Sequence, residues 1–176
     1  LTSNFRHYGV TSATYATPSE SGNGFLYANT PTLTIDTFKQ SGTASHTYGT
    51  NPTAVFNHTV SGFADAEDTL GNIGLTGTAT YTAPTSLSNA GSYTVKYLSG
   101  LSASSGYAIA AGATVGYTVD KAVLSFATTT TIADKVYDGS AAAGAVSVGS
   151  LTGLVGSETL NVTGAAAALA SKNVGS

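Results

Sequence analysis

The stretch SYTVKYL at residues 92–98 decides the fold class, because its apolar and polar residues alternate with a period of two. In a pleated strand this period points Tyr93, Val95 and Tyr97 to one face and the residues between them to the other. A second stretch, TVGYTVD at residues 114–120, repeats the pattern. Both stretches are typical of antiparallel strands with one buried face.

Weaker alternation marks further strands, which are separated by residues that form turns. These strands are expected at residues 31–38, 54–60, 77–82, 123–127, 132–136 and 158–163. Residues 62–70 are compatible with a single helical turn. The alanine-rich residues 164–170 are interpreted as strand or extended loop, because tertiary pairing commonly overrides helix propensity. Many short strands at this spacing predict an all-β fold made of small antiparallel β-sandwiches in tandem.

Composition and charge exclude several classes of protein. Charged residues make up 9% of the 176 residues and the formal net charge is −3, so the clustered Lys and Arg of a nucleic-acid-binding protein are missing. Hydrophobic residues reach 41%, which suffices for a core and argues against a disordered chain. Without cysteine, the fold depends on core packing and sheet hydrogen bonds. The longest apolar stretches are far shorter than the roughly 20 residues of a membrane-spanning helix.

A set of landmarks occurs twice in the same order. The first landmark is Tyr48-Gly49, which returns as Tyr137-Asp138-Gly139. The second is Ser61-Gly62-Phe63 followed by Glu67-Asp68-Thr69-Leu70, which returns as Thr152-Gly153-Leu154 followed by Ser157-Glu158-Thr159-Leu160. The third is Asn89-Ala90-Gly91-Ser92, which returns as Asn173-Val174-Gly175-Ser176. The first landmarks are 89 positions apart, whereas the rungs of a solenoid recur every 20 to 50 residues or so. We therefore expect a repeated domain whose second copy stops before its closing strands.

These motifs resemble the tandem C-terminal repeats of filamentous-haemagglutinin-like adhesins, which are large bacterial proteins exported by two-partner secretion. Residues 43–121 are similar to an MBG domain of the YGX type, and residues 122–176 to the first part of a YDG domain. Residues 1–42 are interpreted as a linker that follows an upstream β-helix. The family motif residues, to which the resemblance assigns a structural role, are Tyr48, Gly49, Gly62, Phe63, Asn89, Gly91, Tyr137, Asp138, Gly139, Asn173 and Gly175.

The resemblance implies two β domains in tandem, either Ig-like or β-grasp-like, in a protein secreted to the bacterial cell surface. It implies a non-enzymatic structural or spacer module that projects an adhesive region away from the cell. The implied partners are neighbouring repeats of the same chain, a host-cell receptor or glycan, and an outer-membrane transporter for the full-length protein. It implies no cofactor, nucleic acid or membrane span.

The residues that could carry chemistry do not form a recognisable constellation. His7, His46 and His58 are expected to be structural or solvated, because no His-x-His pair is present. The acidic cluster at residues 65–68 has two interpretations, an exposed turn or a weak extracellular calcium site. No Gly-x-Ser-x-Gly motif opens a helix, so we expect no catalytic residue.

The ten tyrosines also allow two interpretations. Tyr93, Tyr97 and Tyr117 alternate with valines, which favours a role in the core with the hydroxyls at its rim. Exposed tyrosines with neighbouring threonines would instead form a platform for direct binding of a receptor or glycan. Their location in the structure distinguishes these alternatives, because a binding platform needs an exposed patch.

Two kinds of covalent modification are conceivable. Asn57 and Asn161 stand in N-x-T acceptor sequences, which makes them candidate glycosylation sites. A bond between a lysine, such as Lys96, and an asparagine would cross-link the module as in pilus-type domains. That bond would release ammonia and lower the intact mass.

Overall fold

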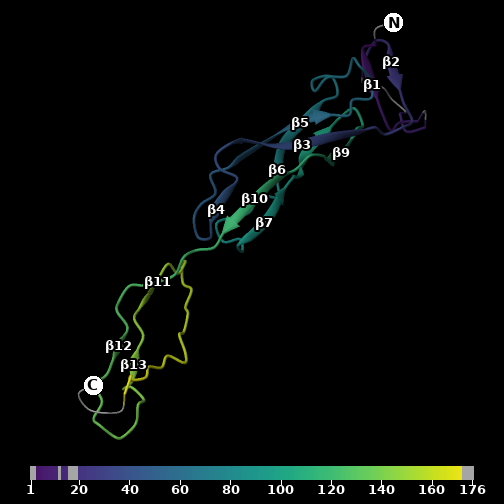
Figure 1. The fold of residues 1–176 in the computed structure, drawn as a ribbon. Coiled ribbons are helices and arrows are strands. Elements are labelled where there is room, and N and C mark those ends of the chain that lie inside the picture. The colour runs from purple at the N-terminus through teal and green to yellow at the C-terminus, as the bar shows by residue number, and fades with distance from the viewer. Residues whose placement is uncertain (1–2, 12, 16–19, 172–176) are drawn as a thin grey trace. The chain divides into compact units, whose positions relative to one another are not determined.

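The computed structural model of the chain describes residues 3–11, 13–15 and 20–171. The chain divides into two compact units, residues 1–120 and residues 121–176, and each is described by itself. Strands, turns and extended segments make up both units, and no helix occurs among the described residues (Figure 1). The protein is therefore all-β, as the alternation in its sequence predicts.

Most strands lie in the first unit. They are β1 (Phe5–His7), β2 (Gly24–Leu26), β3 (Thr32–Ser41), β4 (Ser45–Thr47), β5 (Val55–Ser61), β6 (Leu75–Tyr81), β7 (Gly91–Val95), β8 (Tyr97–Ala103), β9 (Ala108–Ala111) and β10 (Val115–Asp120). Two three-stranded sheets have the orders β5-β3-β9 and β4-β10-β7, and two strand pairs are β6-β8 and β1-β2. The β1-β2 pair lies at the opposite end of the unit from β4 and β7 (Figure 1).

β3 is the central strand of the first sheet. It pairs antiparallel with β5 and parallel with β9. Leu33 and Ile35 alternate with polar residues along β3, and both are fully buried. The structure thus places residues 32–41 in the folded body of the first unit, although they fall within the segment 1–42 that we interpreted as a linker. The physical reason is their period-two pattern, which gives β3 an apolar face that has to be covered.

The stretch at residues 92–98 contributes to two sheets. Val95 and Tyr97 are buried and Tyr93 is half-buried, which confirms the predicted inward face. The prediction of one continuous strand is wrong, because β7 ends at Val95 and β8 begins at Tyr97. β7 pairs with β10, whereas β8 pairs with β6, so the chain passes from one sheet to another at Lys96.

Three strand pairs correct the expectation of purely antiparallel sheets. β1 pairs with β2, β4 with β10, and β3 with β9, and all three pairs are parallel. Alternation reports which face of a strand is buried, but it carries no information on the direction of the neighbouring strand. Residues 62–70, which were compatible with a helical turn, form turns and bends without a helix.

The core of the first unit consists of two clusters. One contains Tyr8, Leu33, Ile73 and Tyr107, with Tyr27, Val60, Phe63, Leu75 and Ala103 packed against them; the other contains Val95, Tyr117 and Val119, with Ala44, Tyr48, Ala54, Phe56, Tyr81, Tyr93 and Val115 packed against them. Each fully buried aliphatic side chain contributes roughly 1.5–3 kcal/mol relative to an exposed one. Tyrosine takes the volume that Trp and Met, both absent from the chain, would otherwise fill.

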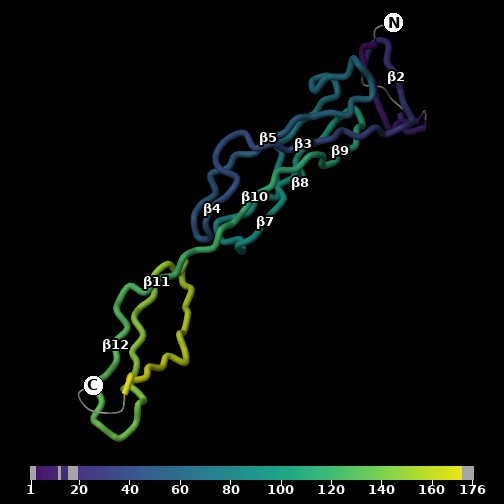
Figure 2. The backbone as a smooth tube through the Cα atoms, viewed as in Figure 1, coloured from purple at the N-terminus to yellow at the C-terminus, as the bar shows by residue number. Residues whose placement is uncertain are grey.

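The second unit is built on one long hairpin. Its strands are β11 (Ser125–Phe126), β12 (Thr131–Ile132), β13 (Val146–Ser147) and β14 (Leu151–Thr152). β11 pairs antiparallel with β14, and β12 with β13; β11 and β12 follow each other along one arm (Figure 2). No residue within the described range 121–171 is buried.

Two predicted segments of the second unit have different outcomes. Residues 158–163 belong to no strand, because alternation alone cannot supply the neighbour that a strand's N–H and C=O groups require. Residues 164–170 form no helix and contain a single bridge residue, in agreement with their interpretation as strand or loop. Their contact with the hairpin includes an isolated antiparallel bridge between Ala142 and Ala168.

The hairpins of the two units have the same register. Thr34 in β3 lies opposite Ser61 in β5, and Ser125 in β11 lies opposite Thr152 in β14. The glycines that follow the second arms are Gly62 and Gly153. Their φ angles are 87° and 95°.

Both glycines approach the first arm of their hairpin closely. A Cβ atom on Gly62 would lie 2.5 Å from the carbonyl oxygen of Thr32, and one on Gly153 would lie 2.2 Å from that of Val123. Thr32 stands two residues before the paired residue Thr34, and Val123 stands two residues before the paired residue Ser125. The residue-by-residue equivalence of the two hairpins therefore extends beyond the paired positions. It makes Leu124 in the second unit the counterpart of Leu33.

We expect Gly62→Ala to destabilise the first unit by about 2 kcal/mol, because a left-handed backbone and a clash with a carbonyl oxygen act together. Urea denaturation followed by resolved NMR amide signals of β3 measures the change. Gly71→Ala is the matched control, since the atom nearest to its Cβ would be 4.0 Å away. An equal loss of stability in the two variants would contradict the prediction.

Candidate functional site

A buried carboxylate joins the first strand of the chain to the core of the first unit. Asp68 lies in the turns between β5 and β6, and its side chain is 2% exposed. Its Oδ2 accepts a hydrogen bond from the hydroxyl of Tyr8 at 2.7 Å and another from the hydroxyl of Tyr107. Its Oδ1 lies 3.6 Å from Nη1 of Arg6 in β1. We call these four residues the Asp68 clasp.

Arg6 also contacts the other acids of the cluster at residues 65–68. Its Nη2 donates a hydrogen bond to Glu67 and lies 3.7 Å from Oδ1 of Asp65. The hydrogen bond to Glu67 raises the pKa of the guanidinium, which therefore stays charged. The cluster thus surrounds a cation of the same chain. In the part of the chain that the structure describes, no group of three or more His, Cys, Asp or Glu side chains could hold a metal ion.

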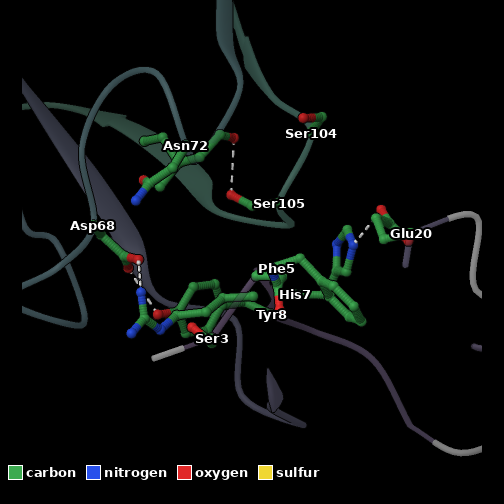
Figure 3. A pocket seen from close by; sticks show the side chains of 12 residues that line it. Ser3, Phe5, His7, Tyr8, Glu20, Asp68, Asn72, Ser104 and Ser105 are labelled. Carbon is green, nitrogen blue, oxygen red and sulfur yellow. Dashed lines mark hydrogen bonds and ion pairs between the residues drawn. The ribbon is translucent and has the colours of Figure 1, made fainter. Parts of the chain in front are cut away.

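A small pocket of about 200 Å³ opens beside the clasp. It is lined by residues 3–8, Glu20, Asp68 and residues of two turns in the core. Asp68 and Glu20 lie on opposite sides of it (Figure 3). Pockets for small-molecule ligands have volumes of roughly 300–1,000 Å³, so this one has room for water or a small ion rather than for an organic substrate.

The side of the pocket opposite the clasp is held by a second polar group. Nε2 of His7 and Oε1 of Glu20 are 2.8 Å apart, and the hydroxyl of Tyr15 donates to Oε2 of Glu20 at 2.6 Å. The hydrogen bonds from Tyr15 and His7 lower the pKa of Glu20 to about 2. The ring of Phe5 stacks on that of Tyr15. These contacts tie the segment before β2 to β1.

Burial and the nearby carboxylate hold the clasp tyrosines in the protonated state. Desolvation raises the pKa of Tyr8 far above its ordinary value, and the hydrogen bond to Asp68 raises it further. The same two causes, in the same order, raise the pKa of Tyr107. Both hydroxyls are therefore donors at neutral pH, which is the state that a buried carboxylate requires.

We expect the first unit to lose about 2 kcal/mol of stability between pH 9 and pH 11. The pKa values of Tyr8 and Tyr107 are raised in the folded state, so the unfolded chain releases its tyrosine protons first. The stabilisation is fully present below the unfolded pKa of about 10 and falls as the pH rises toward the folded values. Urea midpoints measured across this range test the effect.

Tyr8→Phe is the control for this pH dependence. The variant removes one of the two ionisable donors, so its stability should be lower at pH 8 but should fall less steeply above pH 10. An unchanged slope in the variant would contradict the assignment of the effect to the clasp.

Each histidine has a polar partner inside the first unit. His46 is buried; its Nε2 donates to the carbonyl oxygen of Thr85 at 3.1 Å, and its Nδ1 therefore accepts from the hydroxyl of Tyr117 at 2.9 Å in the neutral ring. Nδ1 of His58 lies 2.8 Å from the hydroxyl of Tyr81. His58 in β5 thus contacts β6 of another sheet, whereas His46 in β4 contacts the neighbouring strand β10 of its own sheet. His7 belongs to the pocket.

Tyrosines are almost entirely absent from the exposed surface. Tyr8, Tyr97, Tyr107 and Tyr117 are buried, and Tyr15, Tyr27, Tyr48, Tyr81 and Tyr93 are half-buried. Tyr137 in the second unit, with 62% of its surface exposed, is the exception. Several hydroxyls have internal acceptors; for example, Tyr93 donates to the carbonyl oxygen of Asn89 at 2.6 Å.

The motif residues of the first copy lie at turns and at the edge of the core. Gly49 has a φ of 86°, and its N–H donates to the carbonyl oxygen of Ser86 at 2.8 Å. Tyr48 packs against the second core cluster and Phe63 against the first. Gly91 is the first residue of β7.

The motif residues of the second copy that the structure describes lie on the surface. Tyr137 and Asp138 are exposed, and Gly139 has a φ of 76°. Oδ1 of Asp138 accepts from the N–H of Ser140 at 3.0 Å and lies 2.8 Å from Nζ of Lys135. The hydrogen bond from Lys135 lowers the pKa of Asp138. Asn173 and Gly175 lie outside the described residues.

The candidate modification sites differ in exposure. Asn57 lies within β5 and is half-buried; its Nδ2 donates to Oε1 of Gln40 at 3.3 Å, and its Oδ1 accepts from the N–H of His58. Asn161 is exposed in an extended segment. Lys96 is exposed at the break between β7 and β8.

Sequence reasoning did not find the Asp68 clasp. It singled out the acids at residues 65–68 as a group but did not identify Arg6, Tyr8 and Tyr107 as their partners. Arg6 and Tyr8 are about 60 residues from Asp68 in sequence, and nothing in their spacing indicates the contact. The sequence offered one signal, the scarcity of charged residues. In a chain with so few charges, an arginine is expected to pair with an acidic side chain.

Comparison with known proteins identifies one domain. Residues 120–176 match the family model of the YDG domain, and this range coincides with the second unit to within one residue. No curated protein and no solved structure matches the chain. Among the described residues, no helix is long and apolar enough to cross a membrane.

Proposed function

We propose that the chain is a non-enzymatic spacer module of a large secreted bacterial surface adhesin. It would hold an adhesive region away from the cell, with neighbouring repeats of the same chain as its immediate partners. An MBG-like and a YDG-like β domain in tandem, and export through an outer-membrane transporter, belong to the same proposal. The match of residues 120–176 to the YDG domain supports the part that concerns the second unit.

The observation that carries the proposal is the internal position of the tyrosines. A binding platform needs exposed aromatic rings with adaptable polar neighbours. Here nine of the ten tyrosines are buried or half-buried, so they fill the module rather than face a ligand.

The polar groups of the strands suit a passive secreted module. Thr80 and Ser99 pair across β6 and β8 with oxygens 3.1 Å apart, and Ser125 and Thr152 pair across β11 and β14 at 2.9 Å. Such cross-strand hydroxyl pairs each stabilise a sheet by about 0.2–1 kcal/mol. They cover the sheets with neutral groups that bring no long-range electrostatic field.

The test separates a spacer from a binding module. Beads coated with the protein should bind host epithelial cells and a glycan array no better than beads coated with albumin. When the protein is inserted between a surface anchor and an epitope tag on a bacterium, antibody access to the tag should increase. Bead binding that Tyr137→Ala abolishes would support direct receptor or glycan binding instead, because Tyr137 is the one exposed tyrosine.

A further inference from the structure

The equivalent hairpins of the two units differ in how well their apolar faces are covered. Leu33 and Ile35 of β3 have no exposed surface, whereas their counterparts Leu124 and Phe126 are 42% and 54% exposed. The two hairpins share their register and their left-handed glycine. The difference therefore comes from what packs on the hairpin and not from the hairpin itself.

In the first unit, β9 and the tyrosine before it supply part of this cover. Residues 108–111 run parallel to residues 32–35, and the N–H of Gly112 donates to the carbonyl oxygen of Ile35 at 2.9 Å. The N–H of Thr37 donates to the carbonyl oxygen of Ala113 at 2.9 Å. Tyr107, directly before β9, enters the core cluster that contains Leu33.

The corresponding edge of the second unit has no strand on it. Among the described residues, β11 pairs with β14 alone. The backbone groups equivalent to those that bind β9 are the carbonyl of Phe126 and the N–H of Thr128. The neighbouring amide of Ala127 points the other way and donates to the carbonyl oxygen of Ser150 at 2.7 Å.

The second unit has a hollow lined by residues 148–151, 154 and 158–163. It has a volume of about 650 Å³, and its lining includes Leu151, Leu154 and Glu158. By the repeat, these three residues correspond to Val60, Phe63 and Asp68. In the first unit Val60 and Phe63 pack against the cluster of Tyr107, and Asp68 accepts the hydrogen bond from its hydroxyl.

We propose that the second unit is an acceptor for one added β-strand. The strand would run parallel to β11, carry no charge, and begin with a tyrosine that enters the hollow beside Glu158, as the segment GYAIAAGA at residues 106–113 does in the first unit. Its chemistry matches the edge, because residues 122–128 are also uncharged. Main-chain hydrogen bonds would give affinity, and the tyrosine and isoleucine would give specificity.

The test tethers a second copy of the GYAIAAGA segment to the end of the complete chain. A Gly/Ser linker of about 15 residues has a root-mean-square span of roughly 20 Å and gives a millimolar effective concentration. Hydrogen exchange of single amides, measured by NMR, is the readout. The amide of Thr128 should exchange at least tenfold more slowly in the tethered protein, while that of Ala127, which is already bonded, should change little.

Matched variants distinguish strand addition from non-specific contact. Replacing the tethered isoleucine by aspartate, or introducing Leu124→Asp, should abolish the protection. Val136→Asp, at a residue that is 88% exposed and outside the edge, should preserve it. Equal exchange of Thr128 with the native and the aspartate tether would overturn the proposal. So would protection in the untethered chain that rises with protein concentration, because a second copy would then cover the edge.

Discussion

Replacing Asp68 by asparagine is expected to lower the free energy of unfolding of the first unit by about 3 kcal/mol. The change keeps the size of the side chain but removes the charge that faces the guanidinium of Arg6. Both tyrosine hydroxyls donate to Oδ2, so an asparagine that keeps its oxygen at that place turns its NH2 group toward the guanidinium of Arg6. An asparagine turned the other way leaves both buried hydroxyls facing another donor. Either orientation leaves donors without an acceptor, and their desolvation cost remains.

The measurement is urea denaturation followed by resolved NMR amide signals of β3 and β10. Glu67→Gln is the matched control, because it removes a charge from the same arginine at a side chain that is 59% exposed. Exposed ion pairs contribute only about 0–1 kcal/mol. If the two variants lose the same stability, Asp68 is no more than another surface acid, and the clasp is not what holds β1 to the core.

The sequence predicts the class of the fold and the buried face of its strongest strands. Tyr93, Val95 and Tyr97 face inward as the alternation indicates, because burial of one face is a local property of the pattern. The direction of partner strands is not local. The parallel pairs of β3 with β9 and β4 with β10 join segments far apart in the chain, and no period in the sequence encodes such a pairing.

The site was less predictable than the fold. A hydrogen-bonded clasp depends on Arg6, Asp68 and Tyr107 converging from three separate segments, which only the tertiary structure brings together. The repeat was visible, since Gly62 and Gly153 mark equivalent turns. The interpretation of residues 1–42 as a linker took the family resemblance as its guide to the boundary, whereas the alternation at Leu33 and Ile35 already indicated a strand with one buried face.

The largest contrast between the two units is expected at one pair of equivalent leucines. Leu33→Ala should destabilise the first unit by about 3 kcal/mol, because it removes a fully buried side chain and leaves a cavity. Leu124→Ala, the same substitution at the equivalent position, should cost less than about 0.5 kcal/mol, since that side chain already contacts water. Urea denaturation followed by resolved NMR amide signals of the unit that carries the substitution gives the loss of stability of each variant.

The tethered segment should change this contrast in one direction only. If the added strand covers the face of β11, the loss of stability that Leu124→Ala causes in the second unit should rise toward the loss that Leu33→Ala causes in the first. The loss of stability caused by Leu33→Ala should stay constant. A cost at Leu124 that is already large without the tether would mean that the hairpin has its own cover, and would remove the reason for an added strand. A cost that stays small with the tether would mean that the segment binds elsewhere. The burial of each leucine thus depends on the strand that packs on its hairpin. The substitutions at Leu33 and Leu124 measure this dependence separately in the two units.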